Sequence, residues 1–230
     1  MNLNSTEPVK STLIQLVLDC MESQDAINKV IDLDWVKKKR DWELAITVEM
    51  AEFCEHVSFK WWKKQSPDWS QAFIELTDIY HFLLSRVIES EIPATYLAKA
   101  VERHQTSPIQ NQDVRIAKTH VYAKEIIHKS TGKDSLNAQQ CEEIMGLLIA
   151  LAEFCGRTTD EFFQFFLSKL QLNIFRQRHG YKDGTYIKIW DGREDNEVMH
   201  DLIQANPELG LNANMLYSAL EAAYPEAARA

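Results

Sequence analysis

The sequence predicts an all-α protein, and three observations support this prediction. Apolar residues recur at spacings of three and four along almost the whole chain, which is the period of an amphipathic helix. Seven glycines and six prolines are few for 230 residues, which favours long helices over a turn-rich β architecture. A hydrophobic content of 45% is sufficient for a core. We expect a single helical-bundle domain that spans residues 1–230.

The limits of the individual helices follow from where the apolar period starts and stops. Proline and glycine mark several limits: Pro67 lies near a helix start, Pro93 ends a helix, and Gly156 is a C-terminal cap. We expect a small helical insertion around 105–135, and two weaker helices that close the chain. The expected helices cover about residues 11–31, 42–63, 70–90, 94–104, 113–130, 136–155 and 158–180, so that the core is formed by about 11–90 and 136–180.

The segment "NIFRQRHGYKDGTYIKIWDGREDN", residues 173–196, differs from the rest of the chain. It holds three of the seven glycines and shows no helical or strand period, so we expect a loop at 180–196. Lys169, Asn173 and Arg176 are spaced by four and three, so they share one face of the preceding helix. Cationic side chains beside glycine-bearing turns let charges and backbone N–H groups approach phosphate oxygens. The alternative is a solvated basic face at the end of a helix.

Charge and cysteine usage narrow the range of partners. With 34 acidic and 25 basic residues the net charge is −9, which argues against nucleic-acid binding through the phosphates. Cys20, Cys54, Cys141 and Cys155 show no CxxC spacing, which indicates buried free thiols in a reducing compartment. "MNLNSTEPVK" has no secretory-signal pattern, and no stretch approaches the ~18 apolar residues of a membrane span. We therefore expect a soluble cytoplasmic protein without a membrane partner.

Two acidic pairs lie among apolar residues. Glu49 and Glu52 are three residues apart, as are Glu75 and Asp78, so each pair occupies one face of its helix. If the two helices form an antiparallel hairpin, all four carboxylates converge. Two like charges ~4 Å apart repel by about 4 kcal/mol at an effective dielectric constant near 20, so a dry site needs a cation. Clustered carboxylates suit Mg²⁺, although solvated acidic faces are common and the acids alone do not decide.

Together these motifs resemble a known family. "VEMAE", "ELTDIYHF" and the segment 173–196 are similar to the dimeric, all-α dUTPase family, which belongs with the all-α nucleoside triphosphate pyrophosphatases. "FKWWKK" and "SQDAIN" are similar too, so the resemblance covers roughly residues 12–90 and 140–200 and is weaker around 105–135. His179 is a departure, because the family more often has Asn there.

The resemblance implies the roles of individual residues. Glu49, Glu52, Glu75 and Asp78 match the catalytic Mg²⁺ ligands of the family, and Glu49 matches the base. Gln24 and Asn173 match residues that read the uracil edge. The full set implied to bind the nucleotide is Gln24, Trp62, His81, Phe82, Lys169, Asn173, Arg176, Tyr181, Lys182, Tyr186, Lys188 and Asn196.

The resemblance also implies an activity. It implies a homodimeric dUTP diphosphatase that uses two or more Mg²⁺ ions to form dUMP and pyrophosphate, with dUDP as a further substrate to be tested. The loop at 180–196 would close over the phosphates. Two alternatives remain open at this point. One is the same chemistry on dCTP or another triphosphate, because an Asn or Gln amide can flip to suit either base. The other is a non-enzymatic helical interaction module.

Overall fold

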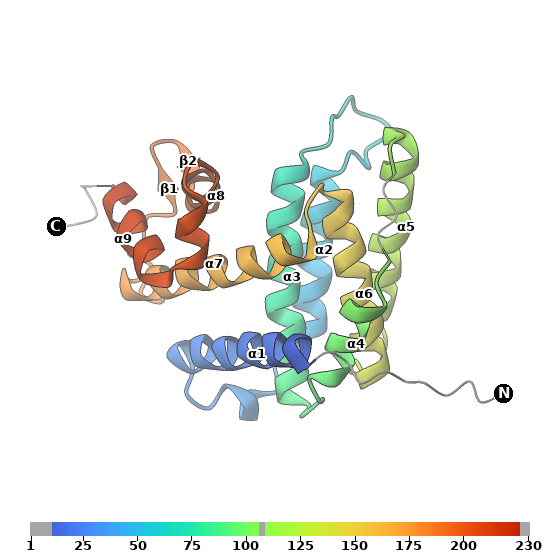
Figure 1. Cartoon of the computed structure of the whole chain (residues 1–230), viewed down its shortest axis with the longest axis horizontal. Coiled ribbons are helices and arrows are strands. Elements are labelled where there is room, and N and C mark those ends of the chain that lie inside the picture. Colours follow the sequence, from blue (N-terminus) through green and yellow to red (C-terminus); the bar gives the residue numbers. More distant parts are fainter. Residues whose placement is uncertain (1–10, 106–108, 226–230) are drawn as a thin grey trace.

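The computed structural model describes residues 11–105 and 109–225, and it confirms the predicted all-α fold. Helices predominate, and the only strands within the described residues form one short hairpin (Figure 1). The elements are α1 Ser11–Ile31, η1 Trp35–Lys38, α2 Trp42–His56, α3 Trp69–Glu89, α4 Thr95–Arg103, α5 Gln112–Ser130, α6 Ala138–Phe154, α7 Thr159–Arg178, β1 Ile189–Trp190, β2 Arg193–Glu194, α8 Asp195–Ala205, η2 Pro207–Leu211 and α9 Ala213–Ala223.

Helix α3 is the centre of the arrangement, because it packs against α1, α2, α6 and α7. In Figure 1, α2, α3, α5 and α6 stand upright, and α1 and α7 run across them. The hairpin, α8 and α9 lie at the far end of α7. Helix α5, in the region predicted as an insertion, packs along α2 and α6. Side chains on α3 can therefore meet side chains from both ends of the chain.

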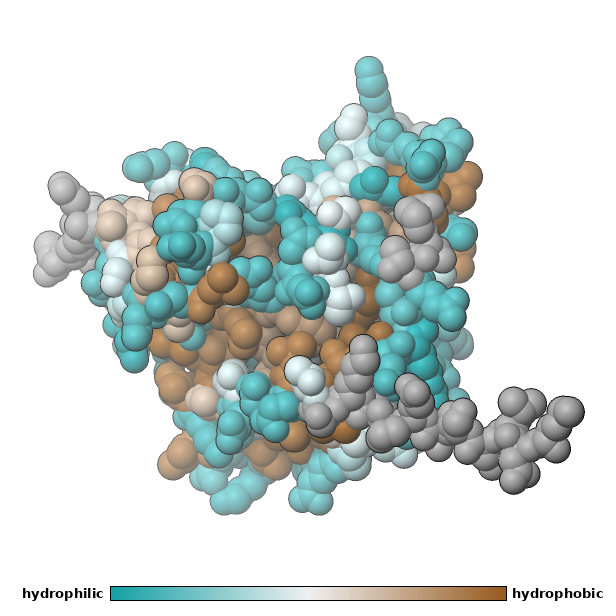
Figure 2. Space-filling model, viewed as in Figure 1, coloured by the Kyte–Doolittle hydropathy of each residue, from teal (hydrophilic) through white to brown (hydrophobic). Residues whose placement is uncertain are grey.

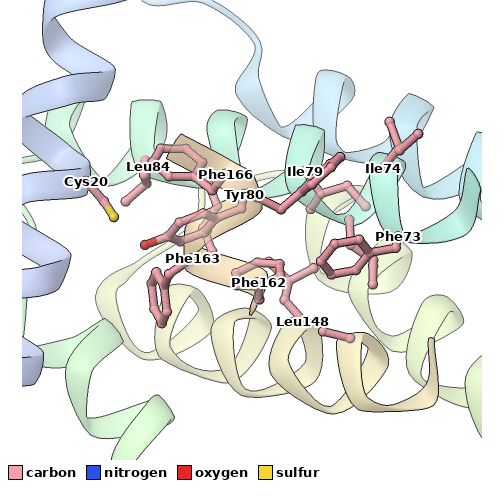
Figure 3. Packing of buried hydrophobic residues seen from close by; sticks show 14 of the residues in the cluster. Cys20, Phe73, Ile74, Ile79, Tyr80, Leu84, Leu148, Phe162, Phe163 and Phe166 are labelled. Carbon is pink, nitrogen blue, oxygen red and sulfur yellow. The ribbon is translucent and has the colours of Figure 1, made fainter. Parts of the chain in front are cut away.

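An aromatic cluster fixes α7 against α3. Tyr80 of α3 is fully buried, and its ring lies 5.3 Å from Phe162 and 4.9 Å from Phe166 of α7, between centroids (Figure 3). Phe73, two turns earlier on α3, contacts Phe162 at 6.3 Å. Rings at such distances add to the hydrophobic gain from burial. The phenylalanine run of α7 therefore belongs to the core.

The prediction that the second helix reaches residue 63 is wrong, because α2 ends at His56. Ser58 has a φ of +64°, which no helix residue adopts, and the Asp68 N–H donates to the His56 carbonyl at 2.8 Å to close the loop. Trp61 and Trp62 are 88% and 60% exposed. The aromatic residues that extended the apolar period in the sequence therefore do not pack against the core.

The prediction of a loop without strands at 180–196 is also partly wrong. β1 and β2 pair antiparallel, with Trp190 opposite Arg193. Asp191 and Gly192 form the turn, with φ values of +50° and +84°, which is the backbone that a two-residue hairpin requires. Two residues per strand are too few to show an alternating pattern. The two closing helices are confirmed as α8 and α9.

The surface has apolar and polar regions that follow the helices. Figure 2 shows apolar side chains gathered over the region where α1 and α7 lie. Leu18 of α1 is 43% exposed and Leu167 of α7 is 36% exposed. No helix within the described residues combines the length and the apolar character that crossing a bilayer requires.

The aromatic cluster gives a first prediction. Replacing Phe162 by alanine removes a fully buried ring between α3 and α7 and leaves a cavity. We expect the free energy of unfolding to fall by about 3–5 kcal/mol, measured by urea denaturation followed by circular dichroism. Val121→Ala, on the exposed side of α5 where the side chain is 59% exposed, is the control and should cost less than about 1 kcal/mol. Equal losses for the two variants would contradict the assignment of this cluster as core.

Candidate active site

A pocket of about 750 Å³ opens where α1, α2, α3, α7 and the start of α8 meet. Side chains from both ends of the sequence line it, as the packing around α3 requires. Most of the residues predicted for the site line this pocket. They are Gln24, Glu49, Glu52, Glu75, Asp78, His81, Phe82, Asn173, Arg176, Tyr181, Lys188 and Asn196.

Three carboxylates converge on one wall of the pocket. Glu49, Glu52 and Glu75 each offer an oxygen, and these oxygens all lie within 4.8 Å of one another. The spacing of three residues places Glu49 and Glu52 on the face of α2 that packs against α3, which carries Glu75. The hairpin of α2 and α3 thus brings together the two acidic pairs that the sequence separates by more than twenty residues.

The fourth predicted carboxylate has a different environment. Asp78 lines the pocket, but its Oδ2 lies 2.7 Å from the Nζ of Lys169, which is only 1% exposed. Removing one partner of such a pair would leave an uncompensated buried charge. Lys169 itself does not line the pocket. The structure therefore places this lysine behind Asp78, where it offsets part of the negative charge of the acidic wall.

Confinement of the carboxylates changes their protonation. Burial is the main cause that raises the pKa of Glu49 to about 8, and the negative charges of Asp78, Glu75 and Glu52 contribute to the same increase. Without a cation, Glu49 is therefore mostly protonated at neutral pH. A divalent cation would take over the role of this proton, and three closely spaced carboxylate oxygens are the hard ligands that Mg²⁺ prefers. The residues present fit such an ion.

A histidine that was not predicted lies beside this wall. His56 Nε2 lies 3.4 Å from Glu75 Oε1, and the hydrogen bond to Glu75 raises the pKa of His56. The histidine follows Glu52 by four residues, so its position on the acidic face of α2 was a readable signal. Asp68, Gln71, Glu194 and Glu197 also line the pocket and were not predicted.

A buried arginine forms part of another wall. Arg176 donates through Nε and Nη2 to the two carboxylate oxygens of Asp195, both at 2.8 Å. Asp195 is fully buried, and Tyr186 donates its hydroxyl to Asp195 Oδ2 at 2.7 Å. Burial acts to raise the pKa of Asp195, but the hydrogen bond and charge of Arg176 hold it below its usual value. Asp195 thus fixes the guanidinium in place, although it was not among the predicted site residues.

Amide and imidazole groups line the pocket between α1 and α3. Gln24 Oε1 lies 2.6 Å from His81 Nδ1, and the two side chains are 4% and 5% exposed. Burial lowers the pKa of His81 to about 4, so the ring is neutral at physiological pH. Asn28 lines the pocket one helical turn after Gln24 and was not predicted, although a second amide at that spacing is a readable signal.

Four predicted residues do not line the pocket. Lys169 pairs with Asp78, and Tyr186 supports Asp195 from behind. Lys182 donates to the carbonyl of Ile31 at 3.0 Å, which ties the segment after α7 to the end of α1. Trp62 lies exposed in the loop after α2, where its ring meets Trp61 edge-on. His179, the departure from the family pattern, stacks on Phe175 at 3.9 Å and is also outside the lining.

The pocket of this all-α fold thus combines clustered carboxylates, which suit a divalent cation, with a fixed guanidinium, which suits an anionic substrate. Residues 17–181 match a family model described as dUTPase, and the chain belongs to this family. The match includes the region around 105–135, where the resemblance of the sequence was weaker. Membership gives the chain dUTP diphosphatase activity and a nucleotide substrate. A comparison with curated proteins finds no match.

The raised pKa of Glu49 predicts how stability depends on pH without metal. The pKa of an unfolded glutamate is 4.5, so folding above this pH requires Glu49 to keep a proton, and the cost grows until about pH 8. Glu49→Gln removes this cost. Because the side chain of Glu49 is only partly buried, solvent screens part of this cost, and we expect a gain of about 1–3 kcal/mol at pH 8 and little at pH 5.

Urea unfolding in EDTA at both pH values measures this difference. Glu55→Gln, on the exposed face of the same helix, is the matched control and should show no such pH dependence. A Glu49→Gln protein that is no more stable than the wild type at pH 8 would contradict the confinement of charge described for this wall.

Proposed function

We propose that the chain hydrolyses dUTP to dUMP and pyrophosphate in a Mg²⁺-dependent reaction in the pocket of about 750 Å³. The observation that supports this most directly is the convergence of Glu49, Glu52 and Glu75 within 4.8 Å, in a chain of the dUTPase family. A nucleoside triphosphate carries several negative charges, and an acidic wall can accept it only through cations. The protein as a whole carries a net charge of −9, which strengthens this requirement.

Glu49, Glu52 and Glu75 would hold the cation, with Asp78 beside them. Bound Mg²⁺ would neutralise charge on the triphosphate, polarise its oxygens and acidify a water molecule. Because Glu49 is protonated at neutral pH without a cation, binding of the ion would displace this proton. The carboxylate then becomes available as a base.

Side chains of the protein would accept the proton and stabilise the charge of the leaving group. Hydrolysis adds one water across the bond between the α- and β-phosphates, and a carboxylate oxygen of Glu49 takes the proton that leaves this water. Arg176, fixed by Asp195, and Lys188 stabilise the charge that grows on the leaving oxygen. Lys188 contacts Glu194 at 3.0 Å and its side chain is about half exposed, so it can exchange this partner for a phosphate.

The base would lie between α1 and α7, where Gln24, Asn28 and Asn173 line the pocket. Arg176 Nη1 donates to Asn173 Oδ1 at 3.1 Å, which directs the Nδ2 donor of Asn173 away from the guanidinium. A donor in this position suits a carbonyl oxygen of uracil. Phe82 lines the same region and offers an aromatic face.

Pyrophosphate release tests the proposal. With Mg²⁺ we expect fast release from dUTP, much slower release from dCTP, and none in EDTA. Glu49→Gln removes the base and one ligand, so it should lower kcat at least about 10³-fold while the far-UV spectrum stays unchanged. Glu55→Gln is the matched control and should retain full activity, because its side chain lies outside the pocket lining. Release that survives EDTA, or full activity of Glu49→Gln, would overturn the metal assignment.

We also propose that the protein is a cytoplasmic homodimer, as the family resemblance implies. The exposed apolar side chains over α1 and α7, among them Leu18 and Leu167, give a surface that a second copy could cover. Light scattering after size exclusion should give twice the chain mass of 26.6 kDa. A mass of one chain at micromolar concentration would contradict this proposal.

A further inference from the structure

A hydrogen-bonded network of four side chains joins α1 to α3 beside the pocket. Gln24 and Asn28 come from α1, and His81 and Ser85 come from α3. Gln24, Asn28 and His81 line the pocket. Ser85 is fully buried, does not line the pocket, and touches both amides. Ser85 therefore joins both amides of α1 to α3 from behind the pocket lining.

The direction of each hydrogen bond follows from Ser85. Its hydroxyl donates to the backbone carbonyl of His81 at 2.9 Å, and a carbonyl can only accept. The single hydroxyl hydrogen is therefore used, and the oxygen of Ser85 can only accept from its other neighbours. Gln24 Nε2 at 3.2 Å and Asn28 Nδ2 at 2.9 Å must both be donors. Neither amide can turn over without bringing its carbonyl oxygen against another acceptor.

This direction determines the tautomer of His81. Gln24 Nε2 uses its two hydrogens on Ser85 Oγ and on Asn28 Oδ1, which lies 3.0 Å away. Gln24 Oε1 then faces His81 Nδ1 at 2.6 Å, so Nδ1 must carry the hydrogen. The other ring nitrogen, Nε2, is left as a buried acceptor without a hydrogen-bond partner among the described residues.

The network leaves a fixed set of free positions at the pocket. Asn28 Oδ1 accepts one hydrogen bond from Gln24, and Asn28 Nδ2 donates one to Ser85. One lone pair on Oδ1 and one hydrogen on Nδ2 therefore remain free. Gln24 keeps one lone pair on Oε1. An oxygen and an N–H on one amide match the N3–H and a carbonyl of uracil. In the same placement, the N3 acceptor and amino group of cytosine meet an acceptor and a donor of the wrong kind.

We propose that Ser85 is the positioning residue for base selection. By accepting from both amides, it prevents the flip that would let the same two side chains accommodate cytosine. This inference rests on the proposed function, because it concerns which triphosphate that reaction takes. Ser85 acts through Gln24 and Asn28 and touches no substrate, so it should control the ratio between bases more than the rate of the chemical step.

The test compares kcat/KM for three triphosphates in the wild type and in Ser85→Ala. The ratio for dUTP over dCTP should move towards one by at least about tenfold, because the freed amides can turn. The ratio for dUTP over dTTP should stay constant, because thymine presents the same imide edge as uracil. Ser85→Thr keeps the hydroxyl, so this variant should have the same ratio of dUTP over dCTP as the wild type. A pocket that had merely become looser would accept dTTP as well, and that result would overturn the proposal.

A matched control lies on α7. Ser168 is 2% exposed, and its hydroxyl donates to the carbonyl four residues earlier at 3.0 Å, as that of Ser85 does, but it touches neither amide. Ser168→Ala should leave both ratios unchanged. An unchanged dUTP over dCTP ratio in Ser85→Ala would overturn the positioning role while the hydrolase assignment stands. A wild type that releases no pyrophosphate from any triphosphate would overturn both.

A second measurement does not depend on turnover. Long-range ¹H–¹⁵N spectra of the metal-free wild type should show His81 as the neutral tautomer protonated at Nδ1. In Ser85→Ala the Nε2-protonated tautomer should appear, because Gln24 can then present its amide nitrogen to Nδ1. The Nε2-protonated form in the wild type would contradict the direction of the network.

Discussion

Mutual repulsion of the carboxylates between α2 and α3 is the constraint on which the rest of the site depends. The packing of the two helices holds the oxygens of Glu49, Glu52 and Glu75 within 4.8 Å. Three features of the surrounding residues reduce this repulsion. Glu49 keeps a proton near neutral pH, His56 shares the charge of Glu75, and a buried lysine pairs with the adjacent aspartate. Each of these contacts offsets charge that the α2–α3 hairpin concentrates.

Hydrogen bonds between side chains hold the other walls of the pocket in place. Arg176 and Asp195 form a bidentate pair in a buried setting, which joins the end of α7 to the start of α8. Ser85 holds two amides of α1 from the side of α3. One wall therefore positions charge and another positions hydrogen-bonding edges, and hydrogen bonds within the protein hold both. A nucleoside triphosphate suits both walls, because its anionic oxygens can meet the wall that positions charge and its polar base edge can meet the wall of hydrogen-bonding groups.

The sequence predicts the helices and the acidic motifs well, because a period of 3.6 and a spacing of three are local properties. It predicts supporting residues poorly, because their partners are distant in the chain. Asp195 and Ser85 look ordinary in the sequence, and only the packing of helices shows what they hold. Lys169 was expected to contact phosphate, but its partner across 91 residues places it behind the pocket. Trp62 was expected at the site because of the family resemblance, but it lies exposed in the loop after α2.

The distance along the chain between partners also has a consequence for the order of assembly. Asp78 and Lys169 are 91 residues apart, and Gln71 meets Glu197 across 126 residues at 2.6 Å. During synthesis from the N-terminus, the α2–α3 hairpin emerges long before the lysine that pairs with it. Long-range contacts of this kind close slowly, because the intervening loop must first lose its freedom. The acidic hairpin must therefore stay hydrated until α7 docks, and the pocket is completed only when the last third of the chain has been made.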